Sequence, residues 1–389
     1  MNRRLVIILF LATIGLYAWP AYQWVSTDNR DSGTFVADPV PASITPDVPL
    51  IHKEFISPDT GNGIVHVASI CELSQGRLAA AWYGGTREGA RDVSIFFSTK
   101  GPGDIASWSR PEKVVDRMSA SKELCRYVKK VGNPVLFSGP GGRLWLVYVT
   151  IAVGGWSGSS LNVTWSDDGG TTWSKSRRLT LSPFFNISEL VRNRPLPLSS
   201  NGFAVPIYHE CLGYFPEILW LQTGLTDPDI HFKKSRMTGG QSFMQPSVVA
   251  FGPSAAIAFY RSLSHKKTIG AAVTTDAGAT WSEPETLSLP NPDAGLDALL
   301  LSDQRILLAF NDSSVNRETL SLAVSHDRGV QWTRIAILES ATGREFSYPY
   351  MIRTQDGHIH LVYTWDRKRI KHVIFNEAWI EAQIKGAMP

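Results

Sequence analysis

The sequence of 389 residues predicts an all-β fold, a six-bladed β-propeller preceded by an N-terminal signal or anchor segment. One phrase, Ser/Thr-x-Asp-x-Gly-x-x-Trp, occurs three times, at 166–173, 274–281 and 325–332. The last two copies lie 51 residues apart and the first two 108 residues apart, which is about two units of the same length. With 32 Gly, 23 Pro and 13 Trp, the composition is typical of many short strands separated by turns.

Each copy of the phrase follows a strand-like apolar run and is expected to form a hairpin turn. The Asp side chain can accept hydrogen bonds from backbone amides, and the Gly supplies a positive φ. The Trp is expected to fold back and cap the hairpin. The preceding runs are residues 161–165, 269–273 and 320–324.

The remaining units are expected from weaker signals. A degraded turn at 224–232 fills the gap between the first two copies of the phrase, and residues 98–104 lead to Trp108 further upstream. The segments 358–363 and 370–375 form a last pair of strands without the phrase. These signals divide the chain into six units of roughly 50–65 residues, each a four-stranded blade. The alternative is a β-sandwich or two small β domains, and three phrases at near-regular spacing count against it.

The N-terminus is expected to be a separate segment. Residues 1–22 start with two arginines and continue into an apolar run, which indicates a signal peptide or a signal anchor. Residues 23–50 are rich in Pro and Asp and are expected to form a flexible tether, and residues 51–380 form the propeller. Either N-terminal role exports the propeller, which is then secreted or anchored to the inner membrane, facing the periplasm. An anchor brings the N-terminal segment into contact with the membrane.

Charge and cysteine content narrow the range of partners. The net charge of +3 is too small to indicate a nucleic-acid-binding protein. Basic residues bunch at 117–130, 177–178, 192–194 and 233–236, where we expect solvated loops or a rim that attracts acidic sugars. Three cysteines are too few for a disulfide framework, although a disulfide between two of them is possible. No Cys/His cluster has metal-ligand spacing. We expect no metal, no cofactor and a monomer.

Residues that break the repeat are the candidates for function, because the repeat itself explains the fold. In the first blade, the Gly-rich loop 84–92 follows an apolar strand and places Arg87, Glu88 and Asp92 where that strand ends. Arg261 ends a buried-looking strand of the fourth blade, where a cation needs a partner. We expect arginines and a tyrosine from different blades to converge on the central pocket, as the ends of inner strands do in propellers.

Together with the three phrases, four motifs give the chain a family resemblance. They read Gly84-Gly85-Thr86-Arg87-Glu88-Gly89, Gln245-Pro246-Ser247, Asn316-Arg317 and Ser347-Tyr348-Pro349. Over about residues 55–375 the chain resembles the bacterial BNR/Asp-box family, the sialidase-like (neuraminidase-like) six-bladed propellers. The resemblance implies a propeller of the sialidase type and an exported glycoside hydrolase similar to exo-α-sialidases. Such an enzyme cleaves a terminal acidic sugar from a glycan or polysaccharide.

The resemblance also implies roles for single residues. In exo-sialidases of this fold, three arginines grip the substrate carboxylate, a Tyr assisted by a Glu is the nucleophile, and an Asp in a first-blade loop is the acid/base. A Tyr nucleophile suits an anionic substrate because a neutral group avoids charge repulsion. By this resemblance Arg261 and Arg317 are the second and third arginines, and Tyr348 is the nucleophile. Asp92 is the acid/base, with Glu88 as its substitute.

Two positions depart from the family pattern. The first arginine has no counterpart, and His66 stands in its place at the start of the first blade. The Glu that assists the Tyr corresponds to Gln245, an amide that cannot act as a base. Glu210 of the third blade is the first choice for the missing carboxylate, and Glu345 is the second. The further substrate-binding candidates are Arg87, Gln245, Asn193 and Asn311.

These departures leave three functions open. The first is hydrolysis of a terminal acidic sugar by a sialidase-like glycosidase, in which a protonated His66 contacts the substrate carboxylate. The second is a polysaccharide lyase or a uronate-directed glycosidase, in which His66 acts as the base and Tyr348 as the acid. The third is a non-catalytic propeller that binds glycans. In every case the expected partner is an acidic glycan or polysaccharide, and not a nucleic acid.

Overall fold

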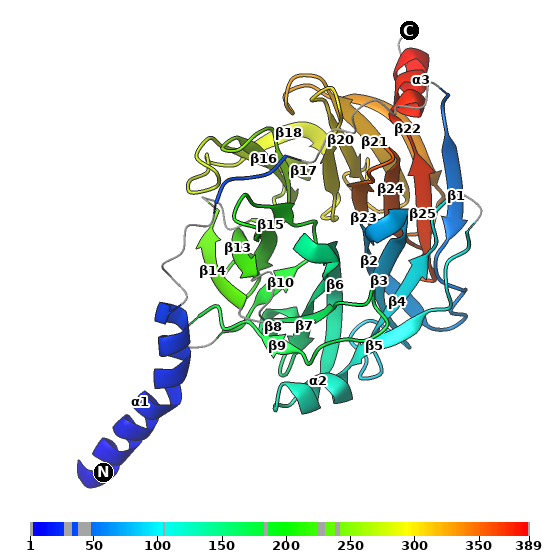
Figure 1. The fold of residues 1–389 in the computed structure, drawn as a ribbon. Helices are drawn as coiled ribbons and strands as arrows, with labels where there is room; N and C mark the ends of the chain where they lie inside the picture. Colours follow the sequence, from blue (N-terminus) through cyan, green and yellow to red (C-terminus); the bar gives the residue numbers. More distant parts are fainter. Residues whose placement is uncertain are drawn as a thin grey trace.

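A computed structural model shows the chain as a six-bladed β-propeller (Figure 1), which confirms the fold class expected from the repeated phrase. The structure describes residues 3–26, 33–37, 48–103, 106–182, 186–223, 230–237 and 242–387. Three sequence predictions fall partly on residues outside these ranges, namely the tether at 27–32 and 38–47, the upstream turn at Asp104, and the degraded turn at 224–229.

The first three blades are each one antiparallel sheet whose strands follow one another in chain order. Blade 1 comprises β2 (Ile64–Glu72), β3 (Leu78–Gly85), β4 (Ser94–Lys100) and β5 (Glu112–Asp116). Blade 2 comprises β6 (Lys130–Ser138), β7 (Leu144–Ile151), β8 (Ser159–Ser166) and β9 (Arg177–Arg178). Blade 3 comprises β10 (Glu189–Val191), β11 (Leu196–Pro197), β12 (Phe203–His209), β13 (Phe215–Thr223) and β14 (Ile230–Arg236), with β10 and β11 both paired to β12.

The last three blades repeat this plan, except that the final one takes its outermost strand from the start of the chain. Blade 4 comprises β15 (Phe243–Ala250), β16 (Ala256–Ser262), β17 (Thr268–Thr274) and β18 (Glu285–Pro290). Blade 5 comprises β19 (Asp297–Leu300), β20 (Ile306–Phe310), β21 (Thr319–Ser325) and β22 (Thr333–Ser340). Blade 6 comprises β23 (Phe346–Arg353), β24 (Ile359–Trp365), β25 (Arg369–Phe375) and β1 (Ile51–Phe55).

The strand β1 therefore closes the ring, and one of its side chains is bonded to both of the blades that it joins. The Glu54 carboxylate accepts hydrogen bonds from Lys100 Nζ (2.6 Å) and Trp108 Nε1 (3.0 Å) on the blade 1 side. The same carboxylate lies 2.9 Å from Nδ1 of His372 in blade 6. Because these contacts connect the first and last blades, they stabilise the propeller at its point of closure.

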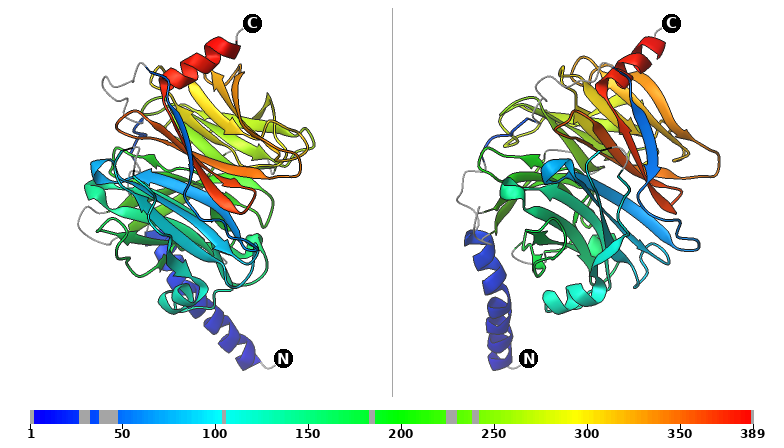
Figure 2. Two further views of the ribbon diagram at one scale, coloured as in Figure 1. Left: turned by 90° about the vertical axis from the view of Figure 1, so that its right-hand side faces the viewer. Right: turned by 45° about the vertical axis from the view of Figure 1, so that its right-hand side comes forward.

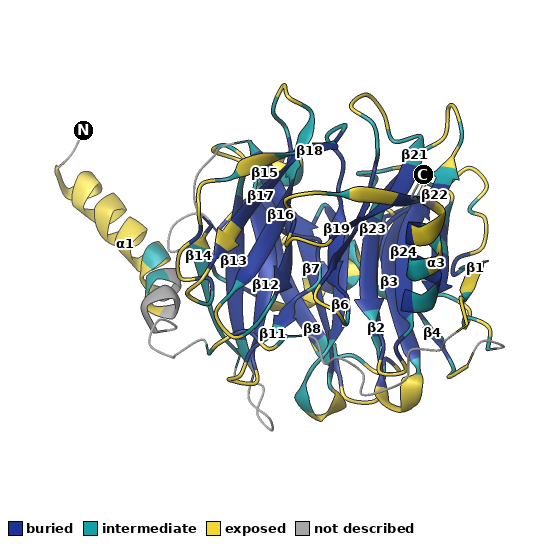
Figure 3. Ribbon diagram, turned by 90° about the horizontal axis from the view of Figure 1, so that it is seen from above, coloured by how far each residue is buried: buried dark blue, intermediate teal, exposed yellow. Residues whose placement is uncertain are grey.

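The core of the propeller lies in the middle of the blades, and exposed residues gather in the loops at their ends (Figure 3). All eight residues of β7 and all five of β20 are buried, because both faces of these strands pack against other residues of the core. Such strands read as nearly continuous apolar runs rather than as alternating patterns, as residues 144–151 and 306–310 do in the sequence.

The described residues also contain three α-helices, all outside the blades. α1 (Arg3–Ser26) extends away from the propeller (Figure 2). Apolar side chains of this helix, such as Leu16, are exposed. No helix among the described residues combines the length and the apolar character that a membrane span requires. α2 (Arg117–Glu123) follows blade 1, and α3 (Glu377–Ala387) packs Trp379 against the core of blades 5 and 6. Three short 3-10 turns, η1 (Ser74–Gly76), η2 (Pro140–Gly142) and η3 (Trp156–Gly158), join strands.

The three repeated phrases form hairpin turns between the third and fourth strands of blades 2, 4 and 5, as expected. In blade 2, Thr172 N donates to the Asp168 carboxylate at 2.8 Å. Gly170 adopts a φ of 99°, and Trp173 of this turn packs edge-on against Phe97 of blade 1, with ring centroids 5.5 Å apart. Blade 5 repeats this contact on blade 4. Each of these two turns therefore also fastens its blade to the preceding one.

Candidate active site

A cavity of about 380 Å³ opens at one end of the blades, where their first strands begin, and all six blades contribute to its lining. Its polar lining consists mainly of arginines, carboxylates and tyrosines. They are Arg192, Arg261, Arg317 and Arg367; Glu88, Glu210 and Asp293; and Tyr83, Tyr208, Tyr214 and Tyr348. Because guanidinium groups outnumber carboxylates in this lining, the cavity favours an anionic ligand.

Four blades present a residue in a left-handed backbone conformation to this cavity. Val67, Asn133, Gln245 and Tyr348 have φ values of 50°, 45°, 53° and 57°, and each lies at a bulge in the first strand of its blade. A left-handed conformation costs free energy in residues other than glycine, and such residues cluster at functional sites. The bulges aim these side chains at the axis of the propeller, where they line the cavity together.

Tyr348 lies among three guanidinium groups. Its hydroxyl is 3.4 Å from Arg261 Nη1, and the guanidinium carbons of Arg192 and Arg317 lie 5.3 and 5.4 Å from its ring centroid. Within the described residues, no carboxylate forms a hydrogen bond with this hydroxyl. Burial raises the pKa of Tyr348, but the charges of Arg261 and Arg317 outweigh burial and lower the pKa below its ordinary value. The tyrosine therefore ionises more easily than a solvated one.

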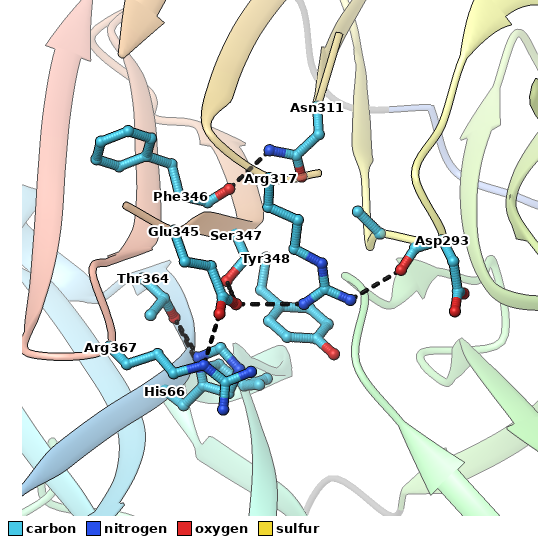
Figure 4. Close-up of polar contacts among 12 residues, drawn as sticks. His66, Asp293, Asn311, Arg317, Glu345, Phe346, Ser347, Tyr348, Thr364 and Arg367 are labelled. Atoms are coloured by element: carbon cyan, nitrogen blue, oxygen red, sulfur yellow. Dashed lines mark hydrogen bonds and ion pairs between the residues drawn. The ribbon is translucent and has the colours of Figure 1, made fainter. Parts of the chain in front are cut away.

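A chain of ion pairs runs beside the cavity and joins blades 1, 6 and 5, and Figure 4 shows its part from Arg367 through Glu345 to Arg317. Arg367 lies 2.6 Å from Glu88 and 2.6 Å from Glu345, and Glu345 lies 3.3 Å from Arg317. Arg317 also donates to the backbone oxygen of Asp293 at 2.8 Å. Burial raises the pKa of Glu345, but hydrogen bonds from Arg367 and Ser347, together with the charge of Arg367, lower it to about 2. This carboxylate is therefore ionised and holds both arginines in place.

A neighbouring part of the cavity wall is built around Arg261, near the end of β16, and Asp293 contacts both Arg261 and Arg317. Arg261 Nε lies 2.6 Å from Asp293 Oδ1, and its Nη1 donates to Gln245 Oε1 at 3.2 Å. Gln245 Nε2 in turn donates to the Tyr208 hydroxyl at 3.1 Å. The Gln245 amide therefore orients Arg261 and contacts Tyr208, and among the described residues it makes no hydrogen bond to Tyr348.

Glu210 and Glu88 are carboxylates of the same cavity with opposite pKa shifts. Burial raises the pKa of half-buried Glu210, so that it keeps its proton to higher pH than a solvated glutamate does. Burial also acts on Glu88, but its hydrogen bond with Arg367 dominates and lowers its pKa. Of the two, Glu210 is the better proton donor near neutral pH.

Asp92 and Arg87, which share a loop with Glu88, do not line the cavity. The Asp92 carboxylate accepts hydrogen bonds from Thr86 N at 2.9 Å and Thr86 Oγ1 at 3.0 Å, and thereby closes the loop between β3 and β4. Arg87 is exposed. Of the carboxylates in this fully described loop, the structure brings Glu88 to the ligand cavity.

His66 lies behind Tyr348 and outside the lining of the cavity. The two rings meet edge to face with centroids 4.8 Å apart, and His66 Nδ1 is 3.0 Å from Thr364 Oγ1 (Figure 4). Burial lowers the pKa of His66 to about 3, and the charge of Arg367 adds to this shift. The imidazole is therefore neutral at neutral pH, and it contacts the nucleophile candidate by packing rather than by charge.

The two asparagines expected in the site are buried supports. Asn311 Nδ2 donates to the backbone oxygens of Phe346 (2.7 Å) and Thr319 (2.8 Å), which fixes the segment that carries Arg317 (Figure 4). Asn193 Nδ2 donates to the Gln245 backbone oxygen at 3.3 Å. Neither side chain lines the cavity.

Sequence reasoning did not single out Arg192 or Arg367. Arg192 belongs to a basic cluster expected in solvated loops or in a rim that attracts acidic sugars, yet only 2% of its surface is exposed. Arg367 lies in the turn between β24 and β25, where it and Asp366 both have left-handed backbones. For Asn133 a signal existed, because its Asn-Pro step matches the Gln-Pro and Tyr-Pro steps at the same place in blades 4 and 6.

The described residues contain one group with metal-ligating atoms close together, Glu189, His209 and Glu217 in blade 3. The Lys234 ammonium forms ion pairs with both carboxylates of this group. A cation of the protein itself therefore already contacts both carboxylates of this cluster. The three cysteines, of which Cys71 is buried, are free thiols.

Comparison with known proteins adds a family and a fold. Residues 76–361 match the family described as BNR repeat-like domain. A similar structure is a protein of unknown function from Dyadobacter fermentans, with 14% identity and a TM-score of 0.65, covering 85% of this chain and 100% of that chain. The Hadza microbial sialidase Hz136 has 16% identity and a TM-score of 0.63, covering 79% of this chain and 65% of that chain. The NanB sialidase of Streptococcus pneumoniae has 12% identity and a TM-score of 0.62, covering 83% of this chain and 70% of that chain. At these identities the likeness establishes the fold alone. No curated protein matches the sequence.

Proposed function

The chain belongs to the family of BNR repeat-like domains, and on this premise we propose that it is an exported, sialidase-like glycoside hydrolase that removes a terminal acidic sugar from a glycan or polysaccharide. One observation carries the proposal. Tyr348 lines a cavity to which blades 3, 4, 5 and 6 each supply an arginine. Such a site binds an anionic ligand beside a tyrosine that ionises easily, which is what a Tyr nucleophile requires.

The arginines bind the carboxylate of the sugar. Arg261 and Arg367 are each held by carboxylates of the protein, Asp293 in the first case and Glu88 with Glu345 in the second. Within the described residues, Nη2 of Arg261 and Nη2 of Arg367 have no hydrogen-bond partner, so each guanidinium keeps a donor for the ligand. Arginines that are fixed in this way bind a carboxylate with little loss of side-chain freedom.

Tyr348 acts as the nucleophile and Glu210 as the acid/base. The phenolate oxygen of Tyr348, after its proton has passed to solvent, bonds to the anomeric carbon while the glycosidic C–O bond breaks. Glu210 gives its proton to the leaving oxygen in this step. A water molecule then attacks the anomeric carbon, Glu210 takes the proton of that water, and the bond to Tyr348 breaks. Two displacements at one carbon retain the configuration of the sugar.

Glu210 fits the acid/base role better than the two first-blade carboxylates. Glu88 is paired to Arg367 and has a lowered pKa, so it lacks a proton to donate near neutral pH. Asp92 lies outside the lining and is bonded to its own loop. Glu210 lines the cavity and its pKa is raised by burial, which suits a general acid.

Incubation of the full chain with a panel of sialylated and uronic-acid glycans tests the proposed function, with Tyr348→Phe as the reference. Release of a free acidic sugar by the wild-type chain, and not by the variant, is the expected result. An unsaturated product that absorbs in the ultraviolet would instead indicate a lyase. Binding without any product would indicate a glycan-binding propeller. Either of these outcomes overturns the proposal.

We also propose that residues 1–22 direct export, that residues 23–50 act as a tether, and that residues 51–380 form the exported propeller. The support is the two arginines followed by an apolar run, whose side chains are largely exposed in α1. N-terminal sequencing of the protein from each cell fraction tests this. A start beyond residue 22 in the periplasm or medium indicates a cleaved signal, and an intact chain in the membrane fraction indicates an anchor. An intact chain in the cytoplasm contradicts export.

A further inference from the structure

We infer that Arg192 is a positioning residue for Tyr348, because it holds the backbone beside this tyrosine and places a fixed positive charge against its ring. Arg192 thereby favours the phenolate through its charge, at a tyrosine whose hydroxyl has no carboxylate hydrogen-bond partner among the described residues. The inference rests on the proposed function in one respect, namely that Tyr348 is the nucleophile.

Arg192 spans the axis of the propeller and connects three blades. It follows β10 in blade 3 and is buried, with 2% of its surface exposed. Its Nη1 donates to the backbone oxygen of Leu296 (2.9 Å), immediately before the first strand of blade 5. Its Nη2 donates to the backbone oxygen of Pro349 in blade 6, the residue after Tyr348. Since Tyr348 has the strained φ of 57°, this bond fixes the backbone where the chain holds the tyrosine in an unfavourable conformation.

The packing around Arg192 leaves room for the guanidinium group and the tyrosine ring together. The guanidinium carbon lies 5.3 Å from the ring centroid of Tyr348, within the range of a cation–π contact. A Cβ at Gly295 would lie 2.7 Å from Tyr348 Cδ1 and 3.1 Å from Arg192 Nε. A side chain at position 295 therefore cannot be accommodated without moving one of them, and glycine keeps the two groups in contact.

The charge of Arg192 is not cancelled by a direct ion pair in the described part of the chain. Asp297 is the buried carboxylate that acts on it electrostatically, but Asp297 itself accepts hydrogen bonds from Ser247 Oγ (2.6 Å) and Met351 N (2.7 Å). A buried cation without a contacting anion acts strongly on its neighbours, because little water screens it. Its nearest titratable neighbour on the cavity side is the phenol of Tyr348.

Other groups also act on Tyr348 and must be separated from Arg192 in a test. Arg261 of β16 and Arg317 of the segment between β20 and β21 favour the phenolate, as Arg192 does. Glu88 of the segment between β3 and β4 opposes the phenolate. His66 of β2 touches the ring but is neutral at neutral pH. Removal of Arg192 leaves all of these groups in place, so that any change in the ionisation of Tyr348 reports on Arg192 itself.

A difference titration of the full chain tests the inference. The near-ultraviolet absorption of tyrosinate is followed against pH for the chain with and without Tyr348→Phe, and the difference gives the titration midpoint of Tyr348. The same comparison, with and without Tyr348→Phe, is then made in the Arg192→Met and Arg192→Lys variants, and in Arg353→Met as the matched control. Arg353 is also an arginine of the propeller whose side chain is only 3% exposed, with an ion pair to Glu377 at 3.1 Å, but it does not line the cavity.

Arg192→Met is expected to raise the midpoint of Tyr348 by about 1–3 pH units, the usual effect of one charge at this distance. Arg192→Lys keeps the charge but cannot bridge Leu296 and Pro349, so we expect a shift of about half that size. Arg353→Met is expected to leave the midpoint unchanged. An unchanged midpoint in folded Arg192→Met, or an equal shift in Arg353→Met, overturns the inference. If Arg192→Met does not fold, an unchanged midpoint in Arg192→Lys overturns it.

This experiment separates the inference from the proposed function, because the titration requires no substrate. A raised midpoint in a protein that releases no sugar from any glycan would refute the glycosidase and leave the effect of Arg192 on Tyr348 intact. Sugar release with an unshifted midpoint would refute the positioning role and leave the glycosidase intact.

Discussion

The two ends of the blades are built by different rules. At the end that carries the repeated turns, hydrogen bonds join residues four positions apart, as from Thr172 N to Asp168 and from Gly170 N to Ser166. At the cavity end, Arg261 and Tyr348 are 87 positions apart, and Arg367 and Glu88 are 279 positions apart. At the first end, the hydrogen bonds are made within each turn, whereas the cavity at the second end is assembled from residues of all six blades.

This difference separates stability from chemistry. The repeated turns lie on the far side of the blades from the cavity, because they follow the third strand, whereas the cavity lies at the start of the first strand. Changes in a turn should therefore affect folding and leave the site intact. Changes in the cavity should affect the reaction and leave folding nearly intact. Four predictions test this separation.

The largest effect is expected at Tyr348. Tyr348→Phe removes the nucleophile and should lower turnover by at least about 10³-fold, because the proposed reaction passes through a bond to its phenolate oxygen. The melting temperature should stay nearly unchanged. Tyr363→Phe is the matched control, because Tyr363 is a buried tyrosine of the same blade whose hydroxyl donates to Glu339 at 2.6 Å, away from the cavity. Full turnover in folded Tyr348→Phe would contradict both the role of Tyr348 as nucleophile and the separation of turnover from folding between the two ends.

A smaller effect on turnover is expected at Glu210. The rate of the wild-type protein should fall as pH rises through the raised pKa of Glu210, because a general acid must carry its proton. Glu210→Gln should remove this alkaline decline and lower turnover by about 10²-fold for a sugar leaving group. The loss should be much smaller for an activated phenol leaving group, which needs no protonation. Glu112→Gln, an exposed glutamate of β5, is the control. Equal losses for both leaving groups would exclude Glu210 as the acid.

At the other end, Gly170→Ala should affect stability and not turnover. A Cβ at Gly170 would lie 2.3 Å from the ring of Phe97, and the φ of 99° disfavours any side chain there. We expect the free energy of unfolding to fall by about 2–4 kcal/mol. Gly141→Ala is the control, since Gly141 has a φ of 73° but open space around it, and it should cost about 1 kcal/mol. Denaturant unfolding measures both, and a loss of turnover in the folded fraction would break the separation.

The smallest effect is expected from Asp168 and appears only in acid. The hydrogen bonds from Thr172 lower the pKa of Asp168 to about 2 from an ordinary value of 3.8. A lowered pKa contributes stability that is present above pH 3.8 and is lost as pH falls toward 2. Asp168→Asn should therefore flatten the dependence of unfolding on pH in this range and leave turnover at neutral pH unchanged. An unaltered pH dependence in the variant would contradict the role of this hydrogen bond.

The difference between local contacts at the turn end and contacts between blades at the cavity end also limits how far the site can be predicted from sequence. Arg261 and Glu88 were expected at the site because they interrupt the repeat, and Arg317 and Tyr348 because of the family resemblance. All four line the cavity. Arg192 was not distinguishable from a surface cation, because its burial depends on partners in blades 5 and 6. Their roles in a reaction stay predictions until the variants are measured.

The amino-acid sequence by itself determined the architecture of this protein, since each repeated turn makes its hydrogen bonds within a few residues and recurs once per blade or two. The tertiary structure alone decided which side chains meet at the axis. It placed Glu88 in the cavity and bonded Asp92 to Thr86, and it buried Arg192 beneath Tyr348. The physical reason is range: a turn is specified by neighbours along the chain, whereas the charge around a buried tyrosine is set by groups that only the closed ring brings together.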